Sequence, residues 1–216
     1  MARPIERQLG VIVAARINPN GNRIKGNVNM TDFVGIADNY LDELTLALTR
    51  FPTGEILKVA EILVDSLAEG TLYVAGNGGS ASTASHMATD LGVGSLRRSN
   101  PLRIVSLVDN AAVLTATAND LSFDQVFSQQ LRLLGKKGDL LICFSASGNS
   151  RNLINAVEEA RSMEIKTISV TGFDGGALRS ISDFNIHIDT PIGSYGVVED
   201  VHSTVSHMLT EIIRSA

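Results

Sequence analysis

The sequence has little of several things that common protein classes need. It contains one cysteine, Cys143, so a disulfide within the chain is excluded, and the surrounding apolar run predicts a buried side chain. No uninterrupted apolar stretch approaches the roughly 20 residues of a membrane-spanning helix, so we expect no membrane partner. Tryptophan is absent and no basic stretch is interleaved with aromatic residues, which leaves no platform for stacking nucleic-acid bases.

A large excess of one charge is also missing. The 216 residues include 18 Lys and Arg against 23 Asp and Glu, a net charge of −5, which disfavours a general nucleic-acid or anionic-membrane binder. Hydrophobic residues make up 44% and charged residues 19% of the chain, which is typical of a globular protein with one substantial core. We therefore expect a cytoplasmic protein without a nucleic-acid partner.

The composition changes near residue 30. Residues 1–29 carry five basic residues against one acid and end in an Asn- and Gly-rich stretch, which predicts a disordered tail. Apolar residues then recur at helical spacing from Thr31 to Arg50, and a second helical pattern runs from Thr53 to Gly70. Residues 30–216 are expected to form a single domain. Its first helix has little of its own domain to pack on and is a candidate for subunit contacts.

Strand and helix patterns alternate regularly after Gly70. The expected strands are Leu72–Ala75, Leu102–Leu107, Asp139–Phe144, Lys166–Val170 and Phe184–Ile188. Helical patterns lie between them, among them Ala111–Ala118, Phe123–Leu134, Leu153–Met163 and, at the end, Val197–Ile213. Strands separated by helices predict an α/β fold with a parallel sheet that is covered on both faces.

Two loops follow expected strands and precede expected helices, Gly76–Ser80 and Ser145–Ser150. Backbone N–H groups and a helix N-terminus converge at such loops and suit a phosphate, and the second loop adds three serine hydroxyls. Neither loop is a nucleotide-binding motif, so no nucleotide cofactor is expected. For either loop alone, a tight turn without a ligand is an equally good interpretation. Behind the first loop, His86 and Asp90 share one helical face.

Taken in order, five motifs are more specific than either loop. They are VAGNGGSASTASHMATDL, TATANDLSFDQVFSQQL, GDLLICFSASGNSRNLINAVEEAR, ISVTGFDGG and VEDVHSTVSHMLTEII. The combination resembles the SIS (sugar isomerase) domain, and within it the phosphoheptose isomerases, which interconvert sedoheptulose 7-phosphate and glycero-manno-heptose 7-phosphate. The likeness runs from about Met30 to the C-terminus. It implies a three-layer sandwich around a mainly parallel five-stranded sheet, an N-terminal helical extension, and a homotetramer with active sites at subunit interfaces.

The resemblance also implies roles for individual residues. The catalytic carboxylate falls on Asp90 and the catalytic histidine on His207. Some members bind zinc, and their ligands match His86, Asp90, Glu199 and His207, which implies one divalent metal per subunit. The family's substrate contacts fall on Asn77, Gly78, Gly79, Ser80, Asn119, Asp120, Ser145, Ala146, Ser147 and Ser150, with Glu199 as a further substrate or metal contact.

The chain departs from the family pattern at three positions. The family usually has Glu where Asp90 stands, Gln where Glu199 stands, and Asp near Gly196. Aspartate is one methylene shorter than glutamate, and this displaces a proton acceptor unless the backbone compensates. Glu199 and His207 are eight residues apart, about 12 Å along a helix. They can meet only if Glu199 lies in the loop before the helix, or if different subunits contribute them.

These observations favour an aldose–ketose isomerase of a phosphosugar, most simply sedoheptulose 7-phosphate, that works by enediol proton transfer. Two alternatives remain open. One is a non-catalytic SIS protein that binds a sugar phosphate or a replication-initiator partner. The other is an isomerase of a different phosphosugar, which the substitutions at Asp90 and Glu199 favour. The set of two histidines and two carboxylates discriminates between enzyme and binding module, because a binding module has no need of it.

Overall fold

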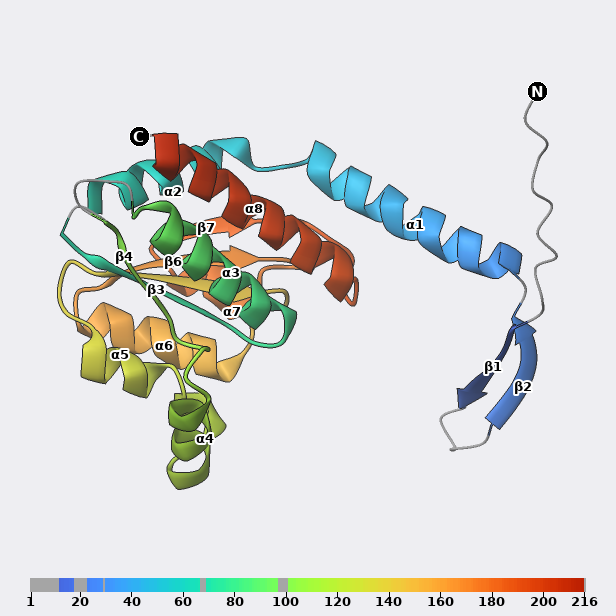
Figure 1. The fold of residues 1–216 in the computed structure, drawn as a ribbon, viewed down its shortest axis with the longest axis horizontal. Coiled ribbons are helices and arrows are strands. Elements are labelled where there is room, and N and C mark those ends of the chain that lie inside the picture. The colour runs from blue at the N-terminus through green and yellow to red at the C-terminus, as the bar shows by residue number, and fades with distance from the viewer. Residues whose placement is uncertain (1–11, 18–22, 29, 67–68, 97–100, 216) are drawn as a thin grey trace. The chain divides into compact units, whose positions relative to one another are not determined.

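The computed structural model describes residues 12–17, 23–28, 30–66, 69–96 and 101–215. Its contacts divide the chain into two units, residues 1–46 and 47–216. The larger unit is built on a five-stranded parallel sheet with the order β4-β3-β5-β6-β7 (Figure 1). Its strands are β3 (Thr71–Gly76), β4 (Arg103–Ser106), β5 (Leu140–Ser145), β6 (Lys166–Thr171) and β7 (Phe184–His187). The predicted α/β fold is confirmed.

Helices cover both faces of this sheet (Figure 1). One face carries α2 (Thr53–Ser66), α3 (Gly79–Gly94) and α8 (Tyr195–Ser215), and the other carries α5 (Ser128–Leu134) and α6 (Arg151–Ser162). The remaining elements of this unit are α4 (Ala111–Asp120), η1 (Phe123–Gln125) and α7 (Gly176–Ile181). All six residues of the central strand β5 are buried. Because a parallel strand is covered on both faces, its sequence is a continuous apolar run rather than an alternating one.

The helix expected at 123–134 is interrupted. The structure has the short η1 and then α5, with Val126 and Phe127 between them. Both of these adjacent side chains are buried in the core. Successive residues of a regular helix point about 100° apart, so a break in the helix lets both large side chains reach the interior.

The smaller unit contains two strands in the segment for which the sequence predicts a disordered tail. Strands β1 (Ile12–Ile17) and β2 (Arg23–Val28) pair antiparallel, with Ile12 opposite Val28. Amino-acid composition alone does not predict this pairing. Residues 1–11, 18–22 and 29, which belong to the same predicted tail, lie outside the described residues.

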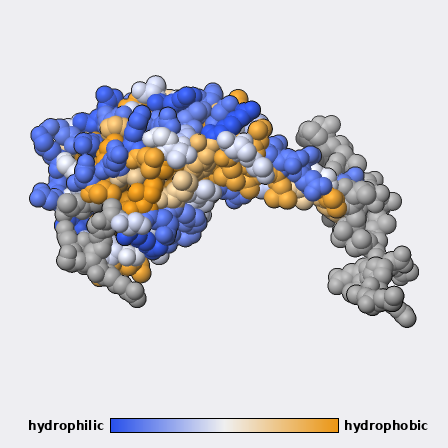
Figure 2. Space-filling model, turned by 90° about the horizontal axis from the view of Figure 1, so that it is seen from above, coloured by the Kyte–Doolittle hydropathy of each residue, from blue (hydrophilic) through white to orange (hydrophobic). Residues whose placement is uncertain are grey.

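Helix α1 (Met30–Thr49) presents an exposed apolar surface, visible as orange side chains along it in Figure 2. The exposed large apolar residues are Phe33, Val34, Ile36, Tyr40, Leu41, Leu46 and Leu48. An apolar surface of this kind on a helix is typical of one that packs against another surface. Within the described part of the chain, no helix combines the length and apolar character that crossing a bilayer requires.

Asp139 joins the start of the sheet to the turn before β5. It is buried, and its carboxylate accepts hydrogen bonds from the backbone N–H of Thr71 at 2.8 Å and of Lys136 at 2.9 Å. We predict that Asp139→Ala lowers the free energy of unfolding by about 2–3 kcal/mol, because two backbone N–H groups lose a charged, buried acceptor. Urea unfolding measures the change. The exposed Glu164→Ala is the control and should change the free energy by less than about 0.5 kcal/mol. Equal effects of the two variants would contradict the role of Asp139.

His202 on α8 makes folding sensitive to pH. It is completely buried beside Phe144, and among the described residues neither ring nitrogen makes a hydrogen bond of ordinary geometry. Burial lowers the pKa of His202 to about 4; the Thr171 backbone opposes this shift in part, and the nearby His187 acts in the same direction as burial. In the unfolded chain the His202 imidazole is protonated below about pH 6.5, whereas in the folded chain it stays neutral down to about pH 4.

We predict that this histidine alone removes about 2 kcal/mol of stability between pH 7 and pH 5. Urea unfolding of the wild type and of His202→Gln at both pH values measures it. The glutamine variant should lose less stability than the wild type over that interval, whatever its own stability at pH 7. Parallel losses in the two proteins would show that His202 does not titrate in this way.

Candidate active site

The two predicted phosphate-type loops lie at the same edge of the sheet. Strands β3 and β5 are parallel neighbours, and Gly76 at the end of β3 is paired with Phe144 near the end of β5. The carboxyl ends of parallel strands meet at one edge, where ligands of such folds bind. The loops that follow the two strands therefore open side by side.

A pocket of about 160 Å³ lies between these loops and the start of α8. Seven of the predicted substrate contacts line it, namely Asn77, Ser80, Ser145, Ala146, Ser147, Ser150 and Glu199. Phe144 and Tyr195 complete the lining. Tyr195 was not predicted as a site residue, because the apolar periodicity of the last helix begins only at Val197. The turn residues Gly193 and Ser194 directly before Tyr195 are the sequence feature that could have indicated an earlier helix start.

The serine loop is fixed by its own hydrogen bonds. The Ser145 hydroxyl accepts the backbone N–H of Gly148 at 3.0 Å, and the Ser147 hydroxyl accepts that of Asn149 at 3.2 Å. Gly148 has φ 64°, and a Cβ there would collide with the backbone oxygen of Gly175, so only glycine fits. Helix α6 begins directly after Ser150. The loop is therefore a preformed cradle at a helix N-terminus, which is a favourable place for a phosphate.

A reciprocal amide pair connects the first loop to α6. Asn77 and Asn152 exchange two side-chain hydrogen bonds of 2.9 Å each. Asn152 is buried, and no sequence motif singles it out. The pair holds the Asn77 side chain at the pocket wall while α6 presents its first turn to the serine loop.

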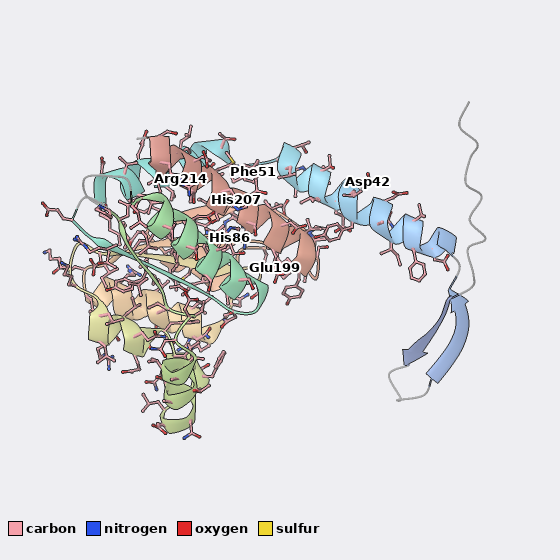
Figure 3. The ribbon with its side chains drawn as sticks, viewed as in Figure 1. Asp42, Phe51, His86, Glu199, His207 and Arg214 are labelled. Atoms are coloured by element: carbon pink, nitrogen blue, oxygen red, sulfur yellow. The ribbon has the colours of Figure 1, made fainter. Side chains whose placement is uncertain are left out.

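Helices α3 and α8 run side by side in the same direction, and this brings the predicted reacting groups together (Figures 1 and 3). The contacts follow in order along both helices: Gly79 with Glu199, Thr83 with Ser203, His86 with His207, and Gly94 with Arg214. Three of these pairs are separated by the same 120 residues in sequence, which defines a constant register.

Three of the four predicted metal ligands meet at the middle of this helix pair. The Asp90 carboxylate lies 3.4 Å from Nε2 of His86 and 3.9 Å from Nε2 of His207. The two imidazole rings lie edge to face with centroids 4.9 Å apart. Figure 3 shows His86 on α3 and His207 on the neighbouring α8. One ligand atom from each of the three residues lies within 4.8 Å of the others. The shorter aspartate thus reaches both histidines without a longer side chain.

Glu199 does not join this triad. It lies inside α8 rather than in a preceding loop, because α8 begins at Tyr195. The expectation that a loop placement would let Glu199 meet His207 in one subunit is therefore wrong. Its carboxylate lies instead over the Cα of Gly79, at the start of α3, where any Cβ would collide with it.

The other predicted contacts are placed separately. Gly78, with φ 57°, and Gly79 form the turn into α3 next to the pocket. Asn119 and Asp120 lie at the exposed end of α4, where the Asn119 amide donates to the Asp120 carboxylate at 2.8 Å, and they do not line the pocket. Asn119 and Asp120 were predicted to share one substrate site with the two loops, but within one chain they lie outside the pocket that the loops form.

Comparisons with known proteins agree with this geometry. The SIS domain family profile matches residues 39–172. The probable phosphoheptose isomerase of Thermoplasma acidophilum is 35% identical over 178 residues, which cover 82% of this chain and 97% of that protein. The phosphoheptose isomerase of Akkermansia muciniphila is 36% identical over 182 residues, covering 83% and 92%.

Solved structures give the same result. The phosphoheptose isomerase from Francisella tularensis superimposes with a TM-score of 0.78 at 29% identity, over 88% of this chain and all of that one. A TM-score of this size over a complete chain means that the whole fold is shared. On these grounds the chain belongs to the SIS domain family, in its phosphoheptose isomerase branch.

Proposed function

We propose that this protein is an aldose–ketose isomerase that interconverts sedoheptulose 7-phosphate and D-glycero-D-manno-heptose 7-phosphate. The observation that carries the proposal is the His86–Asp90–His207 triad, held by the same two helices, α3 and α8, whose first turns border a serine-lined phosphate cradle. Moving a proton between adjacent carbons needs a base, an acid near the carbonyl oxygen, and stabilisation of the enediol. Two imidazoles and a carboxylate within 4.8 Å of one another supply all three functions.

The spacing of the two parts favours a long substrate. The triad begins at His86, seven residues after Gly79 at the start of α3, which is about 10 Å along the helix axis. A phosphate in the Ser145–Ser150 loop therefore lies well away from the reacting groups. A sugar chain that carries its phosphate at one end and reacts at C1 and C2 at the other end spans such a gap. Glu199 and Asn77 line the path and can accept and donate hydrogen bonds to the sugar hydroxyls.

The proposed roles follow from position. Asp90 is less exposed than either histidine, with 27% of its side chain accessible, and lies between them. It takes a proton from one carbon, exchanges it with water, and delivers a proton to the next carbon, while His207 exchanges a proton with the carbonyl oxygen. His86 orients the Asp90 carboxylate, which it approaches from the same helix one turn earlier.

The triad is also a donor set that suits a divalent metal. Two imidazoles and one carboxylate are ligands that zinc prefers, and such sites leave a position open for substrate. We propose that His86, Asp90 and His207 hold one divalent cation per subunit, with zinc as the first candidate, and Glu199 of another subunit as a further ligand. Bound there, the cation would polarise the substrate carbonyl.

We further propose that the protein acts in the cytoplasm as a homotetramer with sites between subunits. His86 and His207 leave about half of their side chains exposed, at 54% and 53%, so a single chain does not exclude water from the triad. Asn119 and Asp120 lie outside the pocket of their own chain and are available to another. The exposed apolar residues of α1 supply a surface for association.

Turnover of sedoheptulose 7-phosphate tests the function directly. We predict that the purified protein forms the aldose product, and that His207→Ala lowers kcat by about 100-fold or more, because general acid–base groups contribute that much. Thr204→Ala, also on α8 but at a half-buried position whose hydroxyl donates to the Asp200 backbone oxygen, is the control and should keep its activity. A panel of other ketose phosphates, with and without divalent metal, is measured alongside. Tight binding without turnover of any member would support the non-catalytic alternative.

The role of α1 predicts a change of oligomeric state. We predict that Ile36→Asp with Leu41→Asp converts a tetramer into smaller species, because charges in a buried apolar contact are costly. Analytical ultracentrifugation measures the mass, and the exposed Glu61→Ala on α2 serves as control. Activity should fall together with the tetramer. A monomer in the wild type, or a double variant that stays tetrameric, would remove α1 from the interface.

A further inference from the structure

Arg214 lies in the last turn of α8 and reaches across to the end of α3. Its guanidinium donates a hydrogen bond of 3.0 Å to the backbone oxygen of Asp90, and it lies over Gly94, where any Cβ would overlap it. A second nitrogen of the group is 3.3 Å from the Glu211 carboxylate on its own helix. Three features thus hold the side chain in place, although 41% of it is exposed.

The two ends of α3 each contact a charged side chain of α8, and the two charges are opposite. The Glu199 carboxylate lies over Gly79 at the N-terminus of α3, and the Arg214 guanidinium lies over Gly94 at its C-terminus. A carboxylate at the positive end of a helix and a cation at its negative end are both stabilised by the helix dipole. Sliding α8 by one turn, about 5.4 Å, would take both charged groups away from their glycines and place one of them over a larger side chain. The end contacts therefore favour this register.

This register sets the geometry of the triad, because Asp90 belongs to α3 and His207 to α8. Asp90 is the residue whose backbone oxygen Arg214 holds, and it lies one turn before Gly94. Arg214 itself does not line the pocket between the phosphate loops. We infer that Arg214 is a positioning residue, which fixes the separation of Asp90 and His207 by locking α3 against α8. The catalytic part of this inference rests on the proposed function, whereas the structural part does not.

The activity test uses three variants. Arg214→Met keeps the length of the side chain and loses its fork, Arg214→Lys keeps the charge, and Gly94→Ala displaces the guanidinium without changing it. We expect Arg214→Met and Gly94→Ala to lower kcat by about 10- to 100-fold with KM changed less than about threefold, and Arg214→Lys to fall between. Arg132→Met is the matched control, because Arg132 makes a forked ion pair with Glu159 on the other face of the sheet. It should leave kcat unchanged.

A disulfide across the helix pair separates positioning from other roles. The hydroxyls of Thr83 and Ser203 are 3.4 Å apart, so Thr83→Cys with Ser203→Cys places two thiols at the centre of the α3–α8 contact. The natural Cys143 is buried, and burial raises the pKa of its thiol to about 12, so it does not compete. Oxidation of the pair should restore most of the kcat that Arg214→Met loses, and reduction should remove it again.

The rate at which this disulfide forms reports the register without any substrate. In the Arg214→Met background we expect the effective concentration of one thiol at the other, and with it the rate of disulfide formation, to be about fivefold lower than with Arg214 present. An unchanged disulfide rate would overturn the inference, and so would a loss of kcat that oxidation does not restore. If the wild type isomerises none of the sugars tested, the proposed function fails while the disulfide rate still decides the role of Arg214.

Discussion

The in-register packing of α3 against α8 is the constraint on which the site depends. Both helices contribute to the triad, and neither carries a complete set of reacting groups. Small residues allow the close approach: Gly79 and Gly94 at the two ends of α3 leave room for the Glu199 and Arg214 side chains. Between them, the Thr83 and Ser203 hydroxyls meet at 3.4 Å. A glycine lowers the stability of a helix. The glycines at the two ends of α3 are explained by the α8 side chains that lie directly over them.

The sheet supplies the other half of the site. It aligns the ends of β3 and β5, so that a glycine turn and a serine loop open toward the same pocket. The serine loop is rigid because its hydroxyls and Gly148 are already engaged with backbone groups. Two rigid parts result, one suited to a phosphate and one to proton transfer, separated by about two turns of α3. A phosphate site and a proton-transfer site at this separation fit a substrate whose phosphate and reacting carbons lie at opposite ends.

Much of this arrangement could be predicted from the sequence. The alternating apolar runs predicted the parallel sheet, and the four-residue spacing of His86 and Asp90 placed them on one face of a helix. The motifs of the family pointed to His207 as well. Periodicity could not show that α8 begins at Tyr195, and so Glu199 was wrongly allowed a place in the loop before it. Arg214 and Asn152 were missed because their partners lie 124 and 75 residues away, and local patterns carry no information on such contacts.

Solvent hydrogen exchange during the reaction tests the central claim most directly. An enediol intermediate passes its proton through a protein group that equilibrates with water. When the protein isomerises sedoheptulose 7-phosphate in heavy water, the account predicts an aldose product that carries deuterium at C2, detected by nuclear magnetic resonance. The same experiment with His207→Ala should give neither product nor exchange. Formation of an aldose without deuterium would contradict proton transfer by this triad, and the absence of any product would contradict the isomerase itself.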